Sequence, residues 1–189
     1  MTSPVLLDHD SLHRALTLLG ERLVGRGVVA DIYVVGEAAM MLAYDSRRAT
    51  RDVDALFTPH GIVLEEAQLV ARQLGLPDSW INEQASVYIS TKPDLQARLV
   101  FEHLGLRVTA ASPEHLLVMK ILSARRFADF DDTVALLRLL DTKDIQEIES
   151  LCKDVFPQEP LSDRGRLFAE DALQAATSAP EDQGHQEST

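Results

Sequence analysis

The segment from residue 31 to residue 57 constrains the fold more than any other part of the chain. It reads DIYVVGEAAMMLAYDSRRATRDVDALF and places two short apolar runs on either side of one helix-length stretch. The β-branched and aromatic run that stops at Gly36 indicates a strand, and EAAMMLAY is typical of a short helix. RDVDALF, bounded by Thr58 and Pro59, predicts a second strand. A sheet with helices packed on it follows from this order.

The rest of the chain changes from strands to helices near residue 112. Helical spacing of apolar residues predicts a first helix over DSLHRALTLLGERLVG, and Ser112 followed by Pro113 is a strong helix start. Further helices are expected at 62–74, 113–126, 131–140, 143–155 and 162–176, and strands at 87–90 and twice within ARLVFEHLGLRVTAAS. These elements predict an α+β fold, with a sheet unit over 1–111 and a helical bundle over 112–176 packed on it as one compact unit.

Composition limits the class of protein and its partners. The chain has 46% hydrophobic and 25% charged residues, which is typical of a soluble globular protein. No run approaches the ~18 apolar residues of a membrane span, and the N-terminus does not resemble a signal peptide, so we expect a cytoplasmic protein with no membrane partner. The polar tail over 177–189 is expected to be disordered.

The charge and the single cysteine exclude further classes. A net charge of -12 argues against a broad surface for nucleic-acid phosphates, so no DNA partner is expected and an anionic ligand needs a local basic cluster. Cys152 lies at an apolar position of a helical pattern, which indicates a core residue rather than a nucleophile.

Asp52 and Asp54 are the strongest candidates for chemistry. Side chains alternate along a strand, so the two carboxylates share one face while Val53, Ala55 and Phe57 share the other. An ordinary ion network with Arg47, Arg48 or Arg51 is one interpretation, and it is the more common one for an isolated Asp-x-Asp. A site for Mg²⁺ or Mn²⁺ is the other, because these ions prefer carboxylate and phosphate oxygens.

Gly36 adds an anion site to this pattern. It lies where a strand ends and a helix begins, and free N–H groups at a helix start favour a phosphate. A glycine in this place is equally often a simple turn. The combination of strand, glycine, short helix, basic loop and Asp-x-Asp strand is much more specific than any of its parts.

Residues 34–57 resemble the first motif of the nucleotidyltransferase superfamily, and within it the AbiEii-like toxins and their small relatives. Arg48, Thr50, Asp52 and Asp54 are in register with Arg-x-Thr-x-Asp-x-Asp, and segments GLPDSWINEQ and SPEHLLVMKILSARRFADFDDTVALLRLL also look like family segments. The resemblance implies a nucleotidyltransferase-like small mixed sheet followed by a C-terminal helical bundle. It also implies that Asp52 and Asp54 bind Mg²⁺ or Mn²⁺ and that Gly36 and Arg48 bind the NTP.

Lys120 stands on the apolar stripe of its predicted helix, so its ammonium either reaches water from the edge of the stripe or needs an anion. The resemblance places a nucleotide-binding lysine here and an acidic residue at the start of the next helix. Asp129, Asp131 and Asp132 compete for that role. We assign it to Asp132, which shares a face with Leu136, and interpret the other two as capping residues.

The resemblance implies transfer of NMP from an NTP to the 3′ end of tRNA by the toxin of a toxin–antitoxin pair, with a cognate antitoxin protein as partner. Thr50 is a possible regulatory residue, because a kinase-like antitoxin phosphorylates a hydroxyl at this place in some related toxins. Two departures from the motif favour alternatives. Glu37 stands where the motif has a small residue, and a third metal-binding carboxylate is not evident, because Glu102, the nearest candidate, is expected to face outward from an edge strand. One alternative is a catalytically degraded protein that acts as a binding partner or antitoxin. The other is an enzyme that nucleotidylates a small molecule or a protein.

Overall fold

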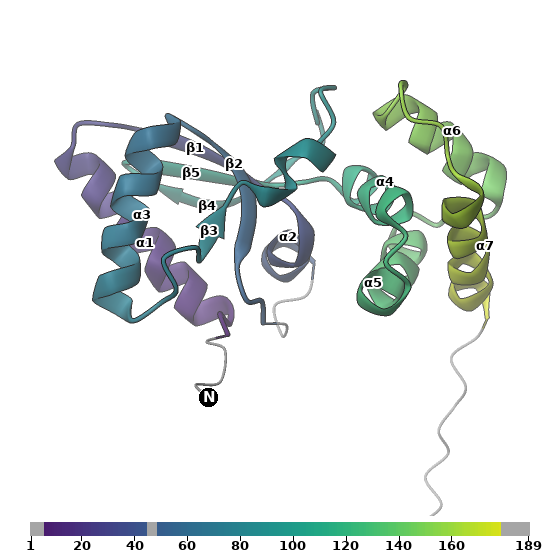
Figure 1. Cartoon of the computed structure of the whole chain (residues 1–189), viewed down its shortest axis with the longest axis horizontal. Helices are drawn as coiled ribbons and strands as arrows, with labels where there is room; N and C mark the ends of the chain where they lie inside the picture. The colour runs from purple at the N-terminus through teal and green to yellow at the C-terminus, as the bar shows by residue number, and fades with distance from the viewer. Residues whose placement is uncertain (1–5, 45–48, 179–189) are drawn as a thin grey trace, which may run out of the picture. The chain divides into compact units, whose positions relative to one another are not determined.

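The computed structural model describes residues 6–44 and 49–178. The chain divides into two compact units, Met1–Leu116 and Leu117–Thr189, and the boundary falls within helix α4 (Pro113–Ser123). The first unit contains the sheet and the second contains helices (Figure 1). Packing of the two parts as one unit stays a prediction, and most of the tail that we expect to be disordered, 179–189, lies outside the described residues.

A mixed five-stranded sheet forms the centre of the first unit. Its strands are β1 (Ala30–Val34), β2 (Val53–Thr58), β3 (Ile81–Asn82), β4 (Arg98–His103) and β5 (Leu106–Ala110), in the spatial order β3-β2-β1-β5-β4. β1 is antiparallel to β2 and parallel to β5, β2 is parallel to β3, and β4 is antiparallel to β5. This mixed sheet with its helices confirms the predicted α+β fold.

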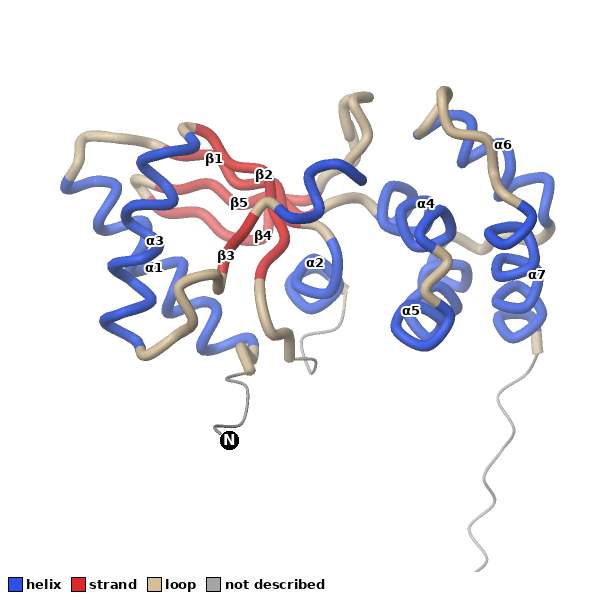
Figure 2. Tube along the Cα trace, in the orientation of Figure 1, coloured by secondary structure: helices blue, strands red, loops and turns tan. Residues whose placement is uncertain are grey.

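One face of the sheet is buried and the other is open. Alternate residues of β1, β2 and β5 are buried, namely Ala30, Ile32, Val34, Val53, Ala55, Phe57, Leu106, Val108 and Ala110. Their neighbours on the opposite face, among them Tyr33, Asp54 and Thr109, are only partly buried. Helices α1 (His9–Gly25) and α3 (His60–Leu74) lie side by side against the sheet (Figure 2). This pattern of burial follows directly from the two-residue period of a strand.

A buried carboxylate holds α1 and α3 together. Glu66 of α3 is 3% exposed and accepts a hydrogen bond of 2.7 Å from Arg22 Nε at one oxygen and of 2.7 Å from an Arg26 guanidinium nitrogen at the other. Both arginines belong to the C-terminal end of α1, where positive charge also favours the helix dipole. The carboxylate is therefore fully paired, as a buried charge requires.

The strand predicted at 87–90 is wrong. Residues Gln84–Tyr88 form a 3-10 helix, η1, and the strand beside β2 is instead Ile81–Asn82. Trp80 decides this register: it is fully buried, its ring N–H donates to the Ala67 carbonyl at 2.9 Å, and its own carbonyl accepts from Val53 N–H at 2.8 Å. Burial of the one tryptophan outweighs the alternating pattern of the residues that follow it.

The second unit is helical in its described part. It contains the end of α4 and helices α5 (Arg126–Leu139), α6 (Ile145–Val155) and α7 (Asp163–Thr177). Phe130 and Phe168 join α5 to α7 with an edge-to-face contact of 6.1 Å between ring centroids. Arg164 donates to the Ala124 carbonyl at 2.8 Å, which attaches α7 to the end of α4. Helix α5 begins five residues before the predicted 131, at Arg126, so Asp131 and Asp132 lie inside it.

Candidate functional site

Gly36, Asp52 and Asp54 come together at one end of the open sheet face. Val35 N–H donates to the Asp54 carbonyl at 2.9 Å, which places the end of β1 beside the start of β2. A Cβ built on Gly36 would lie 3.5 Å from Asp54 Oδ2. Asp52 comes immediately before β2 rather than inside it, and both aspartates are partly buried. The structure therefore gathers the predicted phosphate-binding glycine and the predicted carboxylate pair.

Gly36 begins helix α2 (Gly36–Ala43) with a positive φ of 66°, a conformation that favours glycine over residues with a Cβ. The N-cap residue Val35 makes no side-chain hydrogen bond to the helix. An apolar cap leaves the first N–H groups of α2 to other partners, and an anion is the partner that a helix start favours. The backbone geometry at Gly36 thus suits a phosphate group.

Thr50 and Glu37 form a second contact next to the carboxylates. The Thr50 hydroxyl lies 2.8 Å from the Asp52 carbonyl and 3.2 Å from Glu37 Oε2. Thr50 is 1% exposed and pairs with Leu7 in an isolated bridge, whereas Glu37 lies in the first turn of α2. Thr50, two residues before Asp52, therefore holds the Glu37 carboxylate next to the site.

Asn82 is a site residue that the sequence analysis missed. It is paired in register with Asp54 across β2 and β3, and its side-chain amide donates to Asp52 Oδ2 at 3.3 Å. Its own oxygen accepts from Gln84 N–H at 2.9 Å, so the amide orientation is fixed from both ends. Because Asn82 is 8% exposed, it is a buried polar residue that orients Asp52. The available signal in the sequence was a polar residue directly after the apolar pair Trp80–Ile81.

Replacing Asn82 by alanine is expected to lower any activity that depends on Asp52 by about 10- to 100-fold, because loss of the hydrogen bond that orients a functional carboxylate has effects of this size. The free energy of unfolding should fall by only about 1 kcal/mol. Gln84→Ala is the matched control, since it changes the neighbouring exposed side chain and keeps the backbone N–H that Asn82 binds. Equal rates for the Asn82 variant and the parent would remove Asn82 from the site.

The donor set near Gly36 fits a hard divalent cation bound together with a nucleotide. Asp52 and Asp54 supply carboxylate oxygens, which suit Mg²⁺ or Mn²⁺. In the described residues no group of three or more His, Cys, Asp or Glu side chains is arranged to hold a metal ion. Glu102, the nearest candidate for a third carboxylate, is exposed on the edge strand β4 opposite Arg107, as expected of an outward-facing glutamate. Phosphate oxygens of a substrate would therefore complete the coordination.

Lys120 lies in the second unit and is already paired with two carboxylates. Its ammonium is 3.0 Å from Asp129 Oδ1 and 2.8 Å from Asp132 Oδ2, and all three side chains are at most 8% exposed. The interpretation of Asp129 as a capping residue is wrong, because its carboxylate also accepts hydrogen bonds from Ser123 and Arg125. Asp131 is exposed. The predicted contact of Lys120 with a nucleotide stays a prediction.

The remaining residues of the sequence analysis are placed as follows. Arg48 and its neighbour Arg47 lie outside the described residues, and Arg51 is exposed. Cys152 is 2% exposed, and burial together with the nearby Glu149 raises the pKa of its thiol to about 11. A thiol with this pKa stays protonated and unreactive at neutral pH, as expected of a core residue.

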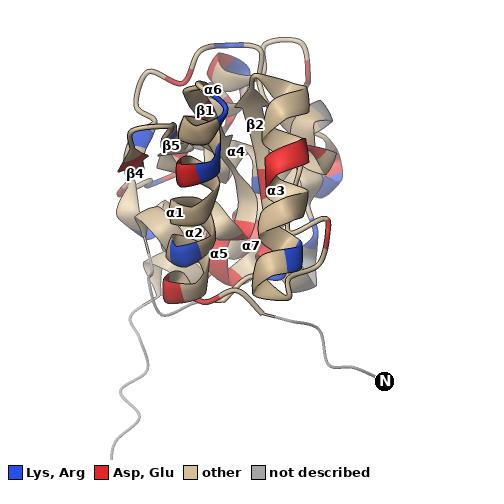
Figure 3. Cartoon of the chain, turned by 90° about the vertical axis from the view of Figure 1, so that its left-hand side faces the viewer, with Lys and Arg blue, Asp and Glu red and all other residues tan. Residues whose placement is uncertain are grey.

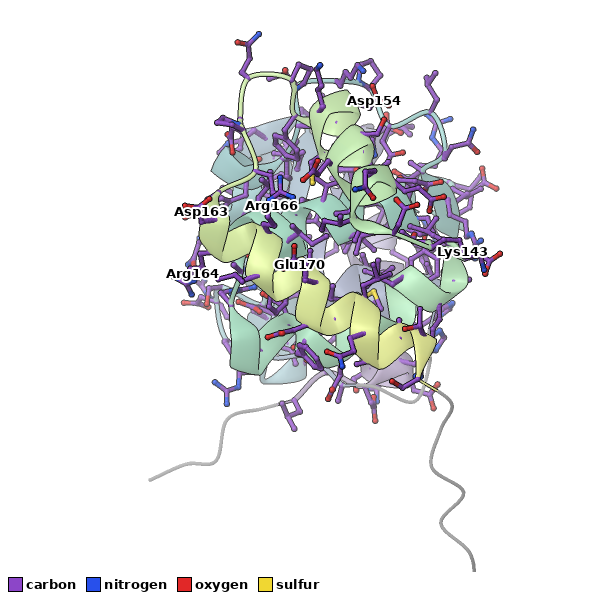
Figure 4. All side chains as sticks on the ribbon, turned by 90° about the vertical axis from the view of Figure 1, so that its right-hand side faces the viewer. Lys143, Asp154, Asp163, Arg164, Arg166 and Glu170 are labelled. Atoms are coloured by element: carbon purple, nitrogen blue, oxygen red, sulfur yellow. The ribbon has the colours of Figure 1, made fainter. Side chains whose placement is uncertain are left out.

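Charges of both signs cover the described surface. Acidic and basic residues both occur on α1 and α3 (Figure 3). The labelled residues of α6 and α7 include Asp154, Asp163, Arg164 and Glu170 (Figure 4). Among the residues that the structure describes, no helix is long and apolar enough to cross a membrane.

A comparison with protein families identifies the chain. A family model described as "Nucleotidyltransferase of unknown function (DUF6036)" matches residues 14–165. This range includes Gly36, Asp52, Asp54 and Asn82, and it continues through the Lys120 cluster. No curated protein and no solved structure matches the chain. The chain belongs to the DUF6036 family of nucleotidyltransferases.

Proposed function

We propose that the chain transfers a nucleoside monophosphate from an NTP to the 3′ end of tRNA, as the toxin of a toxin–antitoxin pair. The observation that supports nucleotidyl transfer most directly is the convergence of Asp52 and Asp54 with Gly36 at the start of α2. The acceptor and the biological role rest on the resemblance of residues 34–57 to the first motif of AbiEii-like toxins. A cognate antitoxin protein is the partner that this role requires.

Each residue of the site has a role in this proposal. Asp52 and Asp54 would hold Mg²⁺ or Mn²⁺, which neutralises charge on the triphosphate when bound. Gly36 and the N–H groups of α2 bind phosphate oxygens, Asn82 orients Asp52, and Arg48 binds the triphosphate. The acceptor hydroxyl attacks the α-phosphorus, and pyrophosphate leaves.

Lys120 and Asp132 complete the proposed set. The resemblance to the nucleotidyltransferase superfamily implies that Lys120 contacts the triphosphate and that Asp132 has an acidic role beside it. The ion pairs of Lys120 with Asp129 and Asp132 hold the ammonium in one position, and a triphosphate would compete with these two carboxylates for it.

A protein or small-molecule acceptor is the second candidate. The net charge of -12 and the mixed charges of the described surfaces favour it, because a polyanionic acceptor such as tRNA gains affinity mainly from clustered Lys and Arg. The two candidate acceptors are distinguished by the molecule that receives the label of an α-labelled NTP: tRNA in one case, and a protein or a small molecule in the other.

The acceptor is tested by incubating the protein with each α-labelled NTP and Mg²⁺ in a cell extract that is divided into RNA, protein and small-molecule fractions. We expect label at the 3′ end of tRNA, and its removal by a 3′ exonuclease. Label only in protein or in small molecules would contradict the tRNA acceptor and leave nucleotidyl transfer intact. Asp78→Asn, an exposed change outside the site, is the control for protein quality.

Control by phosphorylation of Thr50 is part of the toxin proposal. A phosphate there would carry about -1.5 to -2 charges beside Asp52 and would compete with the triphosphate. Because Thr50 is 1% exposed and bridges to Leu7, a kinase would reach the hydroxyl only after this bridge opens. The proposal therefore requires local opening of the N-terminal segment.

A further inference from the structure

A second polar cluster lies where the parallel strands β1 and β5 end, and nucleotide binding does not use it. Its centre is Asp94, whose side chain is 6% exposed. Asp94 Oδ2 accepts a hydrogen bond from the Tyr33 hydroxyl at 2.8 Å and from Ser112 N–H at 2.8 Å, and Oδ1 accepts from Gln96 N–H at 3.2 Å. A carboxylate with three donors is held in one orientation.

His115 is oriented by this carboxylate. Its Nδ1 lies 3.4 Å from Asp94 Oδ1 and 3.1 Å from Ser112 Oγ, and its side chain is 12% exposed. A proton on Nδ1, facing the carboxylate, leaves an unprotonated Nε2. In the described part of the chain Nε2 is buried and makes no hydrogen bond. A buried acceptor without a hydrogen bond lowers the stability of the fold by about 1–3 kcal/mol. A ligand that donates a hydrogen bond to Nε2 would offset this loss.

The cluster borders the same sheet face as the carboxylate pair. Tyr33 of β1 is in register with Leu56 of β2, so Asp54 is its diagonal neighbour on the open face, about 7–8 Å away. A cavity of about 360 Å³ opens on this face, and Tyr33, Leu56 and Thr109 are among its lining residues. Tyr33 thus connects the face that carries Asp54 to the Asp94–His115 pair.

We propose that His115 Nε2, oriented by Asp94, takes the proton of the acceptor hydroxyl. This inference rests on the proposed nucleotidyl transfer. The acceptor O–H bond breaks and its proton moves to Nε2. The acceptor oxygen forms a bond to the α-phosphorus, and the bond from that phosphorus to the bridging oxygen of pyrophosphate breaks. Asp94 is a positioning residue, because it acts through His115.

The groups around the imidazole leave it as the proton acceptor. Burial, with a contribution from Asp94, raises the pKa of the Tyr33 phenol, so it stays a donor. Burial also raises the pKa of Tyr44, whose hydroxyl donates to a backbone carbonyl, while Arg98 opposes this shift and Glu114 adds to it. Glu114 Oε2 is buried without a hydrogen bond and carries no proton to donate when ionised.

The orientation of His115 is tested without turnover, by long-range ¹H–¹⁵N spectra of the labelled protein at pH 7.5. The chain has six histidines, and His115→Gln assigns the signals of interest. We expect a protonated Nδ1 and an unprotonated Nε2 in the parent, and a mixture of both tautomers in Asp94→Asn. A proton on Nε2 in the parent would overturn the proposal, whatever the protein transfers.

The proton transfer is tested by single-turnover rates across pH. His115→Gln is expected to lose about 10²- to 10⁴-fold in rate and to lose the fall in rate at acidic pH, with NTP affinity unchanged. His9→Gln, a partly exposed histidine of α1, is the control. A rate within about threefold of the parent, or an unchanged pH profile with a lower midpoint of thermal unfolding, would show a structural role only. Failure of the proposed nucleotidyl transfer would be seen separately, as an Asp54→Asn variant whose transfer rate equals that of the parent.

Discussion

Replacement of Asp54 by asparagine is expected to reduce the rate of nucleotide transfer by about 10³-fold, the effect of removing one charge that stabilises a phosphoryl transition state. Asn keeps the size and hydrogen-bonding capacity of the side chain but removes the charge that a divalent cation requires. The free energy of unfolding should change by less than about 1 kcal/mol, because the side chain is only partly buried on the open face. Rates are measured in single turnover at saturating NTP.

Two comparisons make the Asp54 result specific. Asp78→Asn makes the same chemical change on an exposed loop before Trp80 and should keep the parental rate. Raising the Mg²⁺ or Mn²⁺ concentration should recover part of the Asp54 loss if the carboxylate binds the cation. Full transfer by the Asp54 variant would mean that this carboxylate takes no part in the reaction.

Replacement of Lys120 by methionine is expected to lower the free energy of unfolding by about 3–5 kcal/mol. The ammonium is the group that lies between Asp129 and Asp132, whose side chains are 3% and 6% exposed. Without it two buried carboxylates face each other, and the Arg125 guanidinium that also contacts Asp129 is 69% exposed. Urea unfolding curves of parent and variant measure the loss.

Two further variants show whether the stability decreases because the buried ion pairs are lost or because any lysine is replaced. Lys143→Met removes an exposed ammonium beside Asp141 and should change stability by less than about 1 kcal/mol. Adding Asp129→Asn and Asp132→Asn to the Lys120 variant removes the two buried negative charges that faced the ammonium and should recover most of the stability. A Lys120 variant as stable as the parent would show that the cluster is not a structural ion pair.

The sequence predicted most of the sheet because the rules that form it are local. Short apolar runs that end at glycine or at Thr58–Pro59 located β1 and β2, and the two strands expected within ARLVFEHLGLRVTAAS are β4 and β5. The strand at 81–82 and the 3-10 helix after it could not be predicted in this way. Their register depends on Trp80, which is buried against Ala67 of α3, and contacts between distant segments leave no periodic signal.

The candidate site was predictable where its residues belong to one continuous motif. Gly36, Asp52 and Asp54 lie within residues 34–57, so a strand, a short helix and a strand bring them together. Asn82 and Asp94 join their clusters from loops and a short strand far along the chain, which only the fold reveals. Asp129 resembled a helix cap because its burial depends on Lys120 of another helix.

The central claim is that this chain catalyses nucleotidyl transfer at the Asp52–Asp54 pair, and the fate of the phosphates tests it most directly. The parent is incubated in parallel with α-labelled and γ-labelled NTP, Mg²⁺ and cell extract as the source of acceptor. The account predicts that α label enters the acceptor, that γ label appears in pyrophosphate, and that Asp54→Asn abolishes both. Transfer of γ label to the acceptor, or no transfer of either label with any NTP, would contradict it.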